Sequence, residues 1–169
     1  MKKVVCFLML ALACCFLGSC MYDPGRYFID REALNKTKSI ELIEYNNPEQ
    51  KEFITWVPDQ FDKLVAFDFS KVSVIETLAE EKINDFLDSF SKMHILHTYY
   101  AYNSPNDVCI KVNYENGEFL IIWANYKRGS FSGYIGEYSQ DGKVLSFWGS
   151  FCALDDYKDL VNNYFSYSI

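Results

Sequence analysis

Turn sequences divide the C-terminal half of the chain into short segments, and this spacing constrains the fold more than any other feature. Within residues 95–152 the turns fall at Asn103–Asn106, Asn116-Gly117, Lys127–Gly129 and Asp141-Gly142. Asn-Gly and Asp-Gly supply the positive φ angles that tight hairpin turns need. The spacing therefore predicts an antiparallel meander of strands over this part of the chain.

The segments between these turns have the side-chain patterns of strands. From Val108 to Tyr114, apolar residues alternate with Cys109, Lys111 and Asn113, which predicts one covered face and one polar face. The segment Phe119–Tyr126 (FLIIWANY) is apolar on both faces, as in a central strand that is covered twice. Further strand candidates lie upstream, at Ser39–Tyr45, Phe53–Val57 and Leu64–Phe69.

Two helices are predicted around this sheet. Between about Val74 and Lys92, apolar residues recur at three- and four-residue spacing on one stripe: Ile75, Leu78, Ala79, Ile83, Phe86, Leu87, Phe90 and Met93. Ser73 and Glu76 match a capping box at the start of this helix. The second helix is predicted over Leu154–Phe165, with acidic residues in its first turn that complement the helix dipole.

These elements together predict an α+β fold. We expect a mostly antiparallel meander sheet of about five to seven strands, with the helix of residues 74–92 packed on one face. The C-terminal helix, residues 154–165, is expected at an edge or on the same face. Residues 39–169 would form one globular domain, preceded by a short tether over residues 20–38.

The N-terminus has the order of residues found in an export signal. Lys2 and Lys3 precede an apolar run from Val4 to Leu17, and no acidic residue occurs before Cys20. The run is shorter than the roughly 20 apolar residues that a membrane-spanning helix needs. We therefore expect residues 1–19 to be a signal peptide that is removed.

The end of this segment carries a recognisable motif. Leu17, Gly18, Ser19 and Cys20 resemble the lipobox of bacterial lipoproteins. The resemblance implies cleavage between Ser19 and Cys20, diacylglycerol on the Cys20 sulfur, and an acylated amino group. Two or more acyl chains would anchor the protein firmly, since each buried methylene contributes about 0.8 kcal/mol.

Other interpretations of this motif remain open. Cys15 and Cys14 fit the lipobox less well, because Cys14 stands where a small residue belongs and Ala11 where the leucine belongs. An ordinary secretory signal cut after Ser19 would leave an unmodified thiol. With a lipid anchor, the protein is expected in the cell envelope. Met21 is not the aspartate associated with inner-membrane retention, which favours the outer membrane where a cell has one.

The charge of the mature chain restricts its partners. Removing residues 1–19 leaves 150 of the 169 residues and 14 basic residues against 23 acidic ones, a net charge of −9. Such a domain repels phosphate backbones and anionic headgroups, so no nucleic-acid partner is expected. The membrane contact is therefore assigned to the lipid on Cys20.

Cys109 and Cys152 are the two cysteines left for the domain after removal of the signal and lipidation of Cys20. In an exported protein they allow one disulfide, which would close a loop of roughly 40 residues and stabilise the fold by about 4 kcal/mol. In a simple meander their strands are not neighbours, so two unpaired thiols are the alternative.

The sequence predicts no catalytic residue, metal site or cofactor. His94 and His97 would point to opposite sides of an extended segment, which disfavours a shared metal. Asp85 and Asp88 are expected on the solvated face of the helix, where a paired-carboxylate hydrolase site is disfavoured. Aromatic residues make up 18% of the chain, and Tyr99–Tyr102 and Tyr134–Tyr138 are candidates for a flat stacking surface.

The preferred function is a non-catalytic, membrane-anchored domain that binds a protein, a peptide or a glycan. The aromatic strands and the anchor motivate this hypothesis. A structural or assembly component of an envelope complex is the alternative, and a hydrolase is the third hypothesis.

Overall fold

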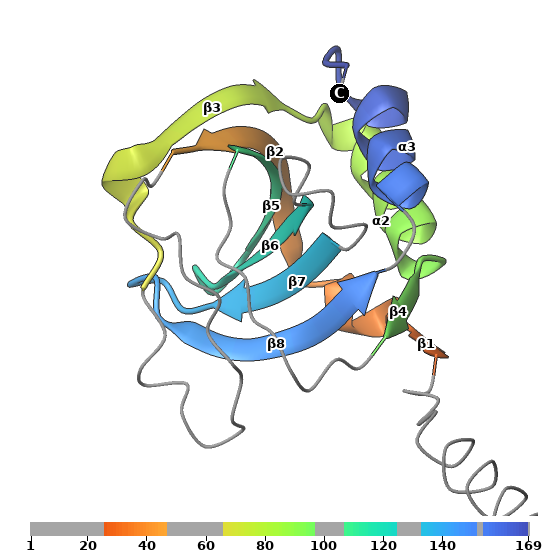
Figure 1. Ribbon diagram of the computed structural model, residues 1–169, viewed down its shortest axis with the longest axis horizontal. Helices are drawn as coiled ribbons and strands as arrows, with labels where there is room; N and C mark the ends of the chain where they lie inside the picture. Colours follow the sequence, from red (N-terminus) through yellow and green to blue (C-terminus); the bar gives the residue numbers. More distant parts are fainter. Residues whose placement is uncertain (1–25, 47–65, 97–106, 125–132, 152–153, 169) are drawn as a thin grey trace, which may run out of the picture.

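The computed structural model of the protein describes residues 26–46, 66–96, 107–124, 133–151 and 154–168. Within these ranges the fold is α+β, with one eight-stranded sheet and two α-helices, which confirms the predicted class (Figure 1). The strands are β1 (Arg26–Phe28), β2 (Thr37–Tyr45), β3 (Val72–Thr77), β4 (His94–Leu96), β5 (Asp107–Tyr114), β6 (Phe119–Ala124), β7 (Gly133–Tyr138) and β8 (Val144–Phe151). The α-helices are α2 (Ile83–Ser91) and α3 (Leu154–Tyr164), and short 3₁₀ turns lie at Glu32–Leu34 (η1), Phe69–Lys71 (η3) and Glu80–Lys82 (η4).

The sheet is antiparallel throughout, in the order β1-β4-β8-β7-β6-β5-β2-β3. Strands β5 to β8 follow one another as the predicted meander. Strand β2 joins β5, and β3 returns beside β2 at one edge. The chain then crosses through α2 to β4, near the opposite edge. This crossover lays α2 over one face of the sheet.

Two of the predicted turns contain a glycine in the left-handed region. Gly117 has φ 85° and Gly142 has φ 82°, values that glycine adopts without the strain a Cβ would cause. The predicted turns at 103–106 and 127–129 lie outside the described residues. Strand β6 is buried at every position, which confirms that it is covered on both faces.

The long helix predicted over residues 74–92 is wrong in its first half. Val74 is part of β3 and pairs with Ile43, while Ser73 pairs with Glu44, so no capping box forms there. The helix α2 begins only at Ile83. The physical reason is that the β-branched segment VSVIET satisfies its backbone against β2, whose edge needs a partner. The helical spacing of the apolar residues carries no information about this long-range pairing of β3 with β2.

The N-terminal boundary also differs from the prediction. Strand β1 pairs with β4, so residues expected in a tether at 20–38 belong to the sheet. The side chains of Ile29 and Leu34 are buried, Leu34 with 0% exposure. Burial of these apolar residues holds the segment against the domain. Any tether therefore ends before Arg26.

Other predicted elements are found with small changes. The first strand candidate, Ser39–Tyr45, becomes β2, and the C-terminal helix becomes α3 on the same face as α2. The part of the candidate Leu64–Phe69 that is described is not a strand, because Phe69 begins η3. Phe53–Val57 lies outside the described residues.

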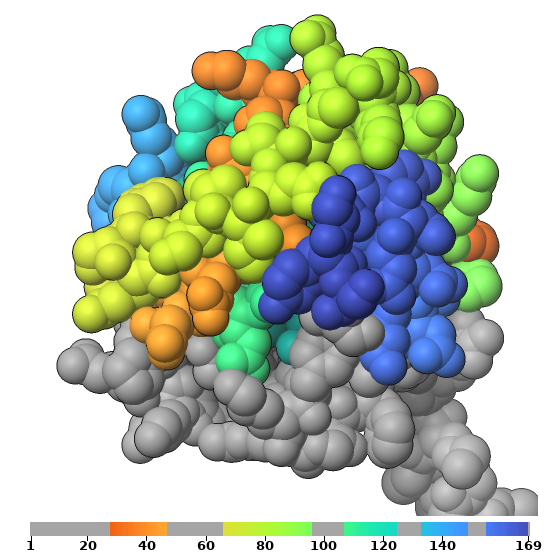
Figure 2. Space-filling view, turned by 90° about the horizontal axis from the view of Figure 1, so that it is seen from above, coloured from red at the N-terminus to blue at the C-terminus, as the bar shows by residue number. Residues whose placement is uncertain are grey.

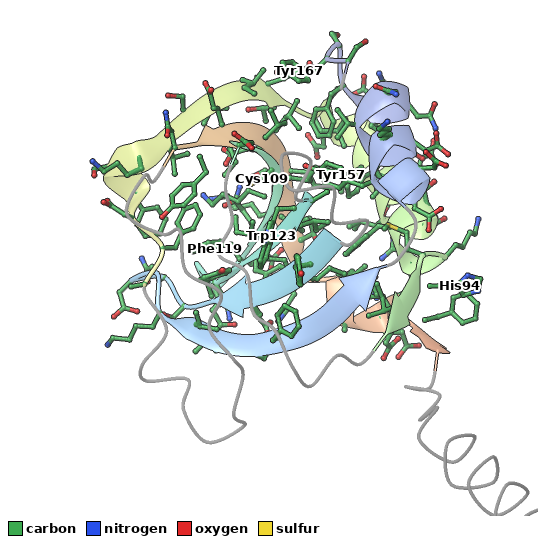
Figure 3. All side chains as sticks on the ribbon, viewed as in Figure 1. His94, Cys109, Phe119, Trp123, Tyr157 and Tyr167 are labelled. Atoms are coloured by element: carbon green, nitrogen blue, oxygen red, sulfur yellow. The ribbon has the colours of Figure 1, made fainter. Side chains whose placement is uncertain are left out.

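The two faces of the sheet carry separate apolar cores. The helix-side core packs α2, α3 and η1 on the sheet, and its larger members include Leu34, Leu42, Phe86, Phe90, Ile122, Tyr157 and Val161. The aromatic core fills the opposite face and contains Ile43, Tyr45, Phe67, Cys109, Phe119, Ile121, Trp123, Tyr134, Tyr138 and Val144. In Figure 3, Phe119 and Trp123 lie between β2 and β3 above and β7 and β8 below. The sheet curls around this second core.

Helix α3 is joined to both its neighbours by tyrosine hydroxyls. The Tyr157 hydroxyl donates to the carbonyl oxygen of Val108 in β5 at 2.8 Å. The Tyr164 hydroxyl donates to the carbonyl oxygen of Asp85 at 2.8 Å and lies 2.6 Å from the Ser89 hydroxyl. These contacts fix the position of α3 beside α2.

Candidate functional site

The lipobox lies outside the described residues, so cleavage after Ser19 and lipidation of Cys20 stay predictions. No helix in the described ranges is long and apolar enough to cross a membrane. Cys109 is buried in the aromatic core, with its Sγ 3.7 Å from the carbonyl oxygen of Asp107. Cys152 is outside the described residues, and the Cys109–Cys152 disulfide also stays a prediction.

The expectation that Tyr134–Tyr138 forms an exposed stacking surface is wrong. Tyr134 and Tyr138 are at most 5% exposed. Tyr138 stacks on Phe119 with ring centroids 5.3 Å apart, and Tyr134 stacks on Trp123 at 5.6 Å. These rings fill the curl of the sheet, because an apolar face of this size is stable only when it is covered. Tyr99–Tyr102 lies outside the described residues.

His94 stands on the surface in β4, and its ring centroid is 4.8 Å from that of Phe28. His97 is outside the described residues. Across the described ranges, no three His, Cys, Asp or Glu side chains come together as a metal-binding group.

The two helix carboxylates considered for hydrolysis have different surroundings. Asp88 accepts a 2.7 Å ion-paired hydrogen bond from the Arg31 guanidinium at the surface. Asp85 is exposed and is bonded to Tyr164 through its backbone carbonyl. The pair is therefore the solvated side of α2, as its helical spacing predicted.

A groove lies where the C-terminal end of α2 and the start of β4 face α3. Its volume is about 330 Å³, and its walls are Ser89, Lys92, Met93, His94, Asp156, Asp159, Leu160, Asn163 and Tyr164. Met93 and Leu160 are buried and form an apolar floor. The other walls carry hydroxyl, carboxylate, amide, imidazole and ammonium groups. The volume is within the range of small-ligand sites, about 300 to 1,000 Å³.

The geometry of α3 explains one wall of this groove. Asp156, Asp159 and Asn163 are spaced three and four residues apart, so they lie on one side of the helix. Leu160, between them, anchors that side to the helix-side core. The carboxylates are thus held at the rim of an apolar floor, where they can accept hydrogen bonds from a ligand.

The sequence contained only a partial signal for the groove. A polar stripe at residues 156, 159 and 163 is visible in the sequence, but the same pattern describes any solvated helix face. The opposite wall comes from residues 89–94, more than 60 positions earlier. Only the packing of α3 beside α2 brings the two walls together.

A second polar cluster lies at the end of the sheet near η1. The Glu137 carboxylate accepts from Lys36 Nζ at 3.2 Å, from the Ser146 hydroxyl at 2.8 Å and from Trp148 Nε1 at 3.4 Å. Lys36 Nζ also lies 4.0 Å from the centroid of the Tyr114 ring. This network joins the residue before β2 to strands β7 and β8, which gives it a structural role.

The Tyr114 hydroxyl is the exception in this cluster, since it is buried without a hydrogen-bond partner. Burial raises its pKa well above the ordinary value of 10.0, and the negative charges of Glu137 and Glu118 raise it further. The hydroxyl therefore stays neutral in the folded protein under ordinary conditions.

Comparison of the chain with protein-family models, curated proteins and solved structures found no match.

Proposed function

We propose that the protein is a lipid-anchored, non-catalytic binding domain of the cell envelope. Lipid on Cys20 holds it at a membrane surface, the outer membrane where the cell has one. The groove between α2, β4 and α3 binds a short polar segment of a protein, a peptide or a glycan. The observation that supports this function is the groove itself, with polar walls above the apolar floor of Met93 and Leu160.

Ligands that carry both polar groups and an apolar part suit this groove. Asp156 and Asp159 supply acceptors from one side, and Lys92 supplies a donor from the other. The apolar floor of Met93 and Leu160 lies beneath these groups, so a ligand would combine an apolar contact with hydrogen bonds to the rim. A groove of this size accommodates the end or one side chain of a longer molecule.

Adjacent residues on α3 allow a matched test of the groove. Asn163 lines it, while its neighbour Asn162 is exposed and is not among the lining residues. A photo-crosslinking amino acid is placed at one position or the other in the full chain, in the membranes of cells that produce it. We expect a discrete adduct from position 163 and none from position 162. Mass spectrometry of the adduct identifies it as peptide or glycan.

The adduct should also depend on the rim carboxylates. The double change Asp156→Asn and Asp159→Asn is expected to abolish it. The control change Asp155→Asn, at an exposed residue on the same helix turn but outside the groove, is expected to leave it intact. Equal labelling from positions 162 and 163, or an adduct indifferent to both carboxylates, would contradict binding in the groove.

The anchor is tested separately by intact-mass measurement. Cys20→Ala should remove the diacylglycerol mass and release the protein from membranes. Cys15→Ala, which changes the rival candidate, should leave both unaltered. A Cys20→Ala protein with unchanged mature mass and membrane association, apart from the substitution, would refute the lipid anchor.

An assembly role has one observation in its favour. Strand β3 forms an edge of the sheet, and its yellow-green segment lies on the face seen in Figure 2. It exposes Val74 and Ile75, by 55% and 39%. Exposed apolar edge strands readily pair with another strand. Val74→Lys is expected to dissociate such a complex, and a size measurement on detergent-extracted protein that is unchanged by Val74→Lys would argue against this role.

A further inference from the structure

We propose that the edge of the sheet formed by β1 and β4 rests, through the exposed side chain of Phe28, on the phospholipid bilayer that carries the lipid on Cys20. This inference depends on the proposed lipid anchor and adds to it an orientation of the domain.

Phe28 is the first observation. Its side chain is 60% exposed, the largest exposed fraction among the large apolar side chains in the described part of the chain. It pairs with His94 across β1 and β4, and the two ring centroids are 4.8 Å apart. A phenyl ring exposed to this extent is covered only in part by the described residues, and its transfer from water to an apolar phase is favourable.

Chain length is the second observation. Six residue steps separate Cys20 from Arg26, the first residue of β1. Fully extended, six steps span about 20 Å, so β1 cannot move farther than that from the acylated residue. Among the described residues, the most exposed apolar ring is thus on the strand that follows the proposed anchor most closely in the sequence.

The other exposed aromatic ring of the described chain is on a different side. Phe69, 45% exposed, is in η3, which precedes β3. In Figure 1, β1 and β4 lie at the lower right of the molecule and the start of β3 lies at the left. A domain held at β1 therefore brings Phe28 to the bilayer and keeps Phe69 away from it.

The composition of the edge suits the interfacial region of a bilayer. His94 is exposed beside the Phe28 ring, and Lys92, two residues before His94, is exposed as well. An imidazole and an ammonium group are favourable at headgroup depth. Asp30 and Glu32, both exposed, follow β1. Because they oppose attraction to anionic headgroups, the contact depends on insertion of the ring and on the anchor, and not on a basic patch.

This orientation has a consequence for the groove. His94 belongs both to the β1–β4 edge and to one end of the groove, and Lys92, two residues before it, also lines the groove. That end would open close to the bilayer, while Asn163 and Tyr164 lie farther along α3. A ligand would therefore enter within reach of the membrane surface.

Photolabelling of the acylated full chain tests the orientation. The protein is reconstituted in phosphatidylethanolamine–phosphatidylglycerol vesicles that contain a phospholipid with a diazirine at headgroup depth. After irradiation, peptides are mapped by mass spectrometry. We expect lipid adducts on residues 26–28 and 92–95, and loss of the β1 adducts in Phe28→Ser. The matched change Phe69→Ser should leave the labelling pattern unchanged.

The outcomes separate the orientation from the anchor. Intact mass first establishes whether the purified protein is acylated, and an unacylated protein would overturn the anchor and this inference with it. Leu145, in β8, is a further exposed apolar residue. Acylated protein that is labelled at Phe69 or Leu145 as strongly as at Phe28 would overturn the orientation alone. Circular dichroism of Phe28→Ser checks its folding. If that variant fails to fold, the positions of the lipid adducts on the unsubstituted protein still test the orientation.

Discussion

The hydroxyl of Tyr157 donates a 2.8 Å hydrogen bond to the carbonyl oxygen of Val108. This bond links the C-terminal helix α3 to the first residues of β5, and Tyr157 is itself fully buried (Figure 3). The groove exists only where α3 packs beside α2. By holding α3 in position, this hydrogen bond stabilises one wall of the candidate site.

Tyr157→Phe tests that support. The change keeps the ring but leaves the Val108 carbonyl without this donor, so the free energy of unfolding should fall by about 1 to 2 kcal/mol. Urea unfolding followed by circular dichroism measures the loss. Tyr167→Phe, at a half-buried residue beyond α3, is the control and should change stability by less than about 0.5 kcal/mol. Equal losses in both variants would contradict a specific role for the Tyr157 bond.

Tyr114→Phe should have a pH-dependent effect. The raised pKa of Tyr114 means that its hydroxyl ionises in the unfolded chain near pH 10.0 but resists ionisation in the folded protein. The unfolded state then binds fewer protons, so stability is lost as the pH rises above 10.0, by up to about 1.4 kcal/mol per pH unit.

The variant lacks this ionisation and also lacks a buried hydroxyl without a partner. At pH 7 we therefore expect a stability equal to or slightly above that of the parent. Above pH 10.0 the variant should become progressively more stable than the parent. Denaturant unfolding at pH 7, 10 and 11 checks both expectations, and parallel stability curves for the two proteins would contradict the burial of this group.

Gly142→Ala should be much more harmful than Gly117→Ala, although both glycines have φ above 80°. A Cβ on Gly142 would collide with the carbonyl oxygen of Phe67, whose amide donates to Gly142 at 2.7 Å. At Gly117 the Cβ would meet the flexible side chain of Gln140 at 3.1 Å. We expect losses of about 2 to 5 kcal/mol and 1 to 2 kcal/mol respectively in thermal or urea unfolding. Equal losses of stability in the two variants would show that the Phe67 backbone does not pack against the turn between β7 and β8.

Leu34→Ala tests where the domain begins. Leu34 has 0% exposure and packs in the helix-side core, so its truncation should reduce stability by about 2 to 5 kcal/mol. Leu145→Ala, at a residue that is 43% exposed in β8, should reduce it by less than about 1 kcal/mol. If Leu34→Ala is as mild as Leu145→Ala in urea unfolding, the domain begins near residue 39, as the sequence alone suggested.

The sequence predicted well wherever a structure depends on neighbouring residues. The Asn116-Gly117 and Asp141-Gly142 turns follow from the φ angles that glycine allows, and the alternation at Val108–Tyr114 follows from the period of a strand. Helix α3 was predicted within one residue of its C-terminal end, because its apolar stripe and acidic first turn are local features.

Prediction from the sequence failed where the structure of a segment depends on residues that are distant in the sequence. Ile75 fits a helical stripe as well as a strand, and the outcome depends on the pairing of its neighbour Val74 with Ile43 in β2, some 30 positions away. Tyr134 and Tyr138 suit an exposed stacking face or a core equally well, and the curl of the sheet buried them. The groove was not predicted because its walls come from two helices whose packing no local pattern specifies.

The sequence by itself determined the class of fold, the meander and its turns, the acidic charge, and the lipobox expectation centred on Cys20, since each depends on composition or on adjacent residues. The tertiary structure decided which faces are covered, where the domain begins, and which polar residues converge. It also placed Phe28 at an uncovered edge beside His94. The physical reason is that burial and convergence are properties of long-range packing, in which segments far apart in the chain compete for the same apolar surface and the same hydrogen bonds.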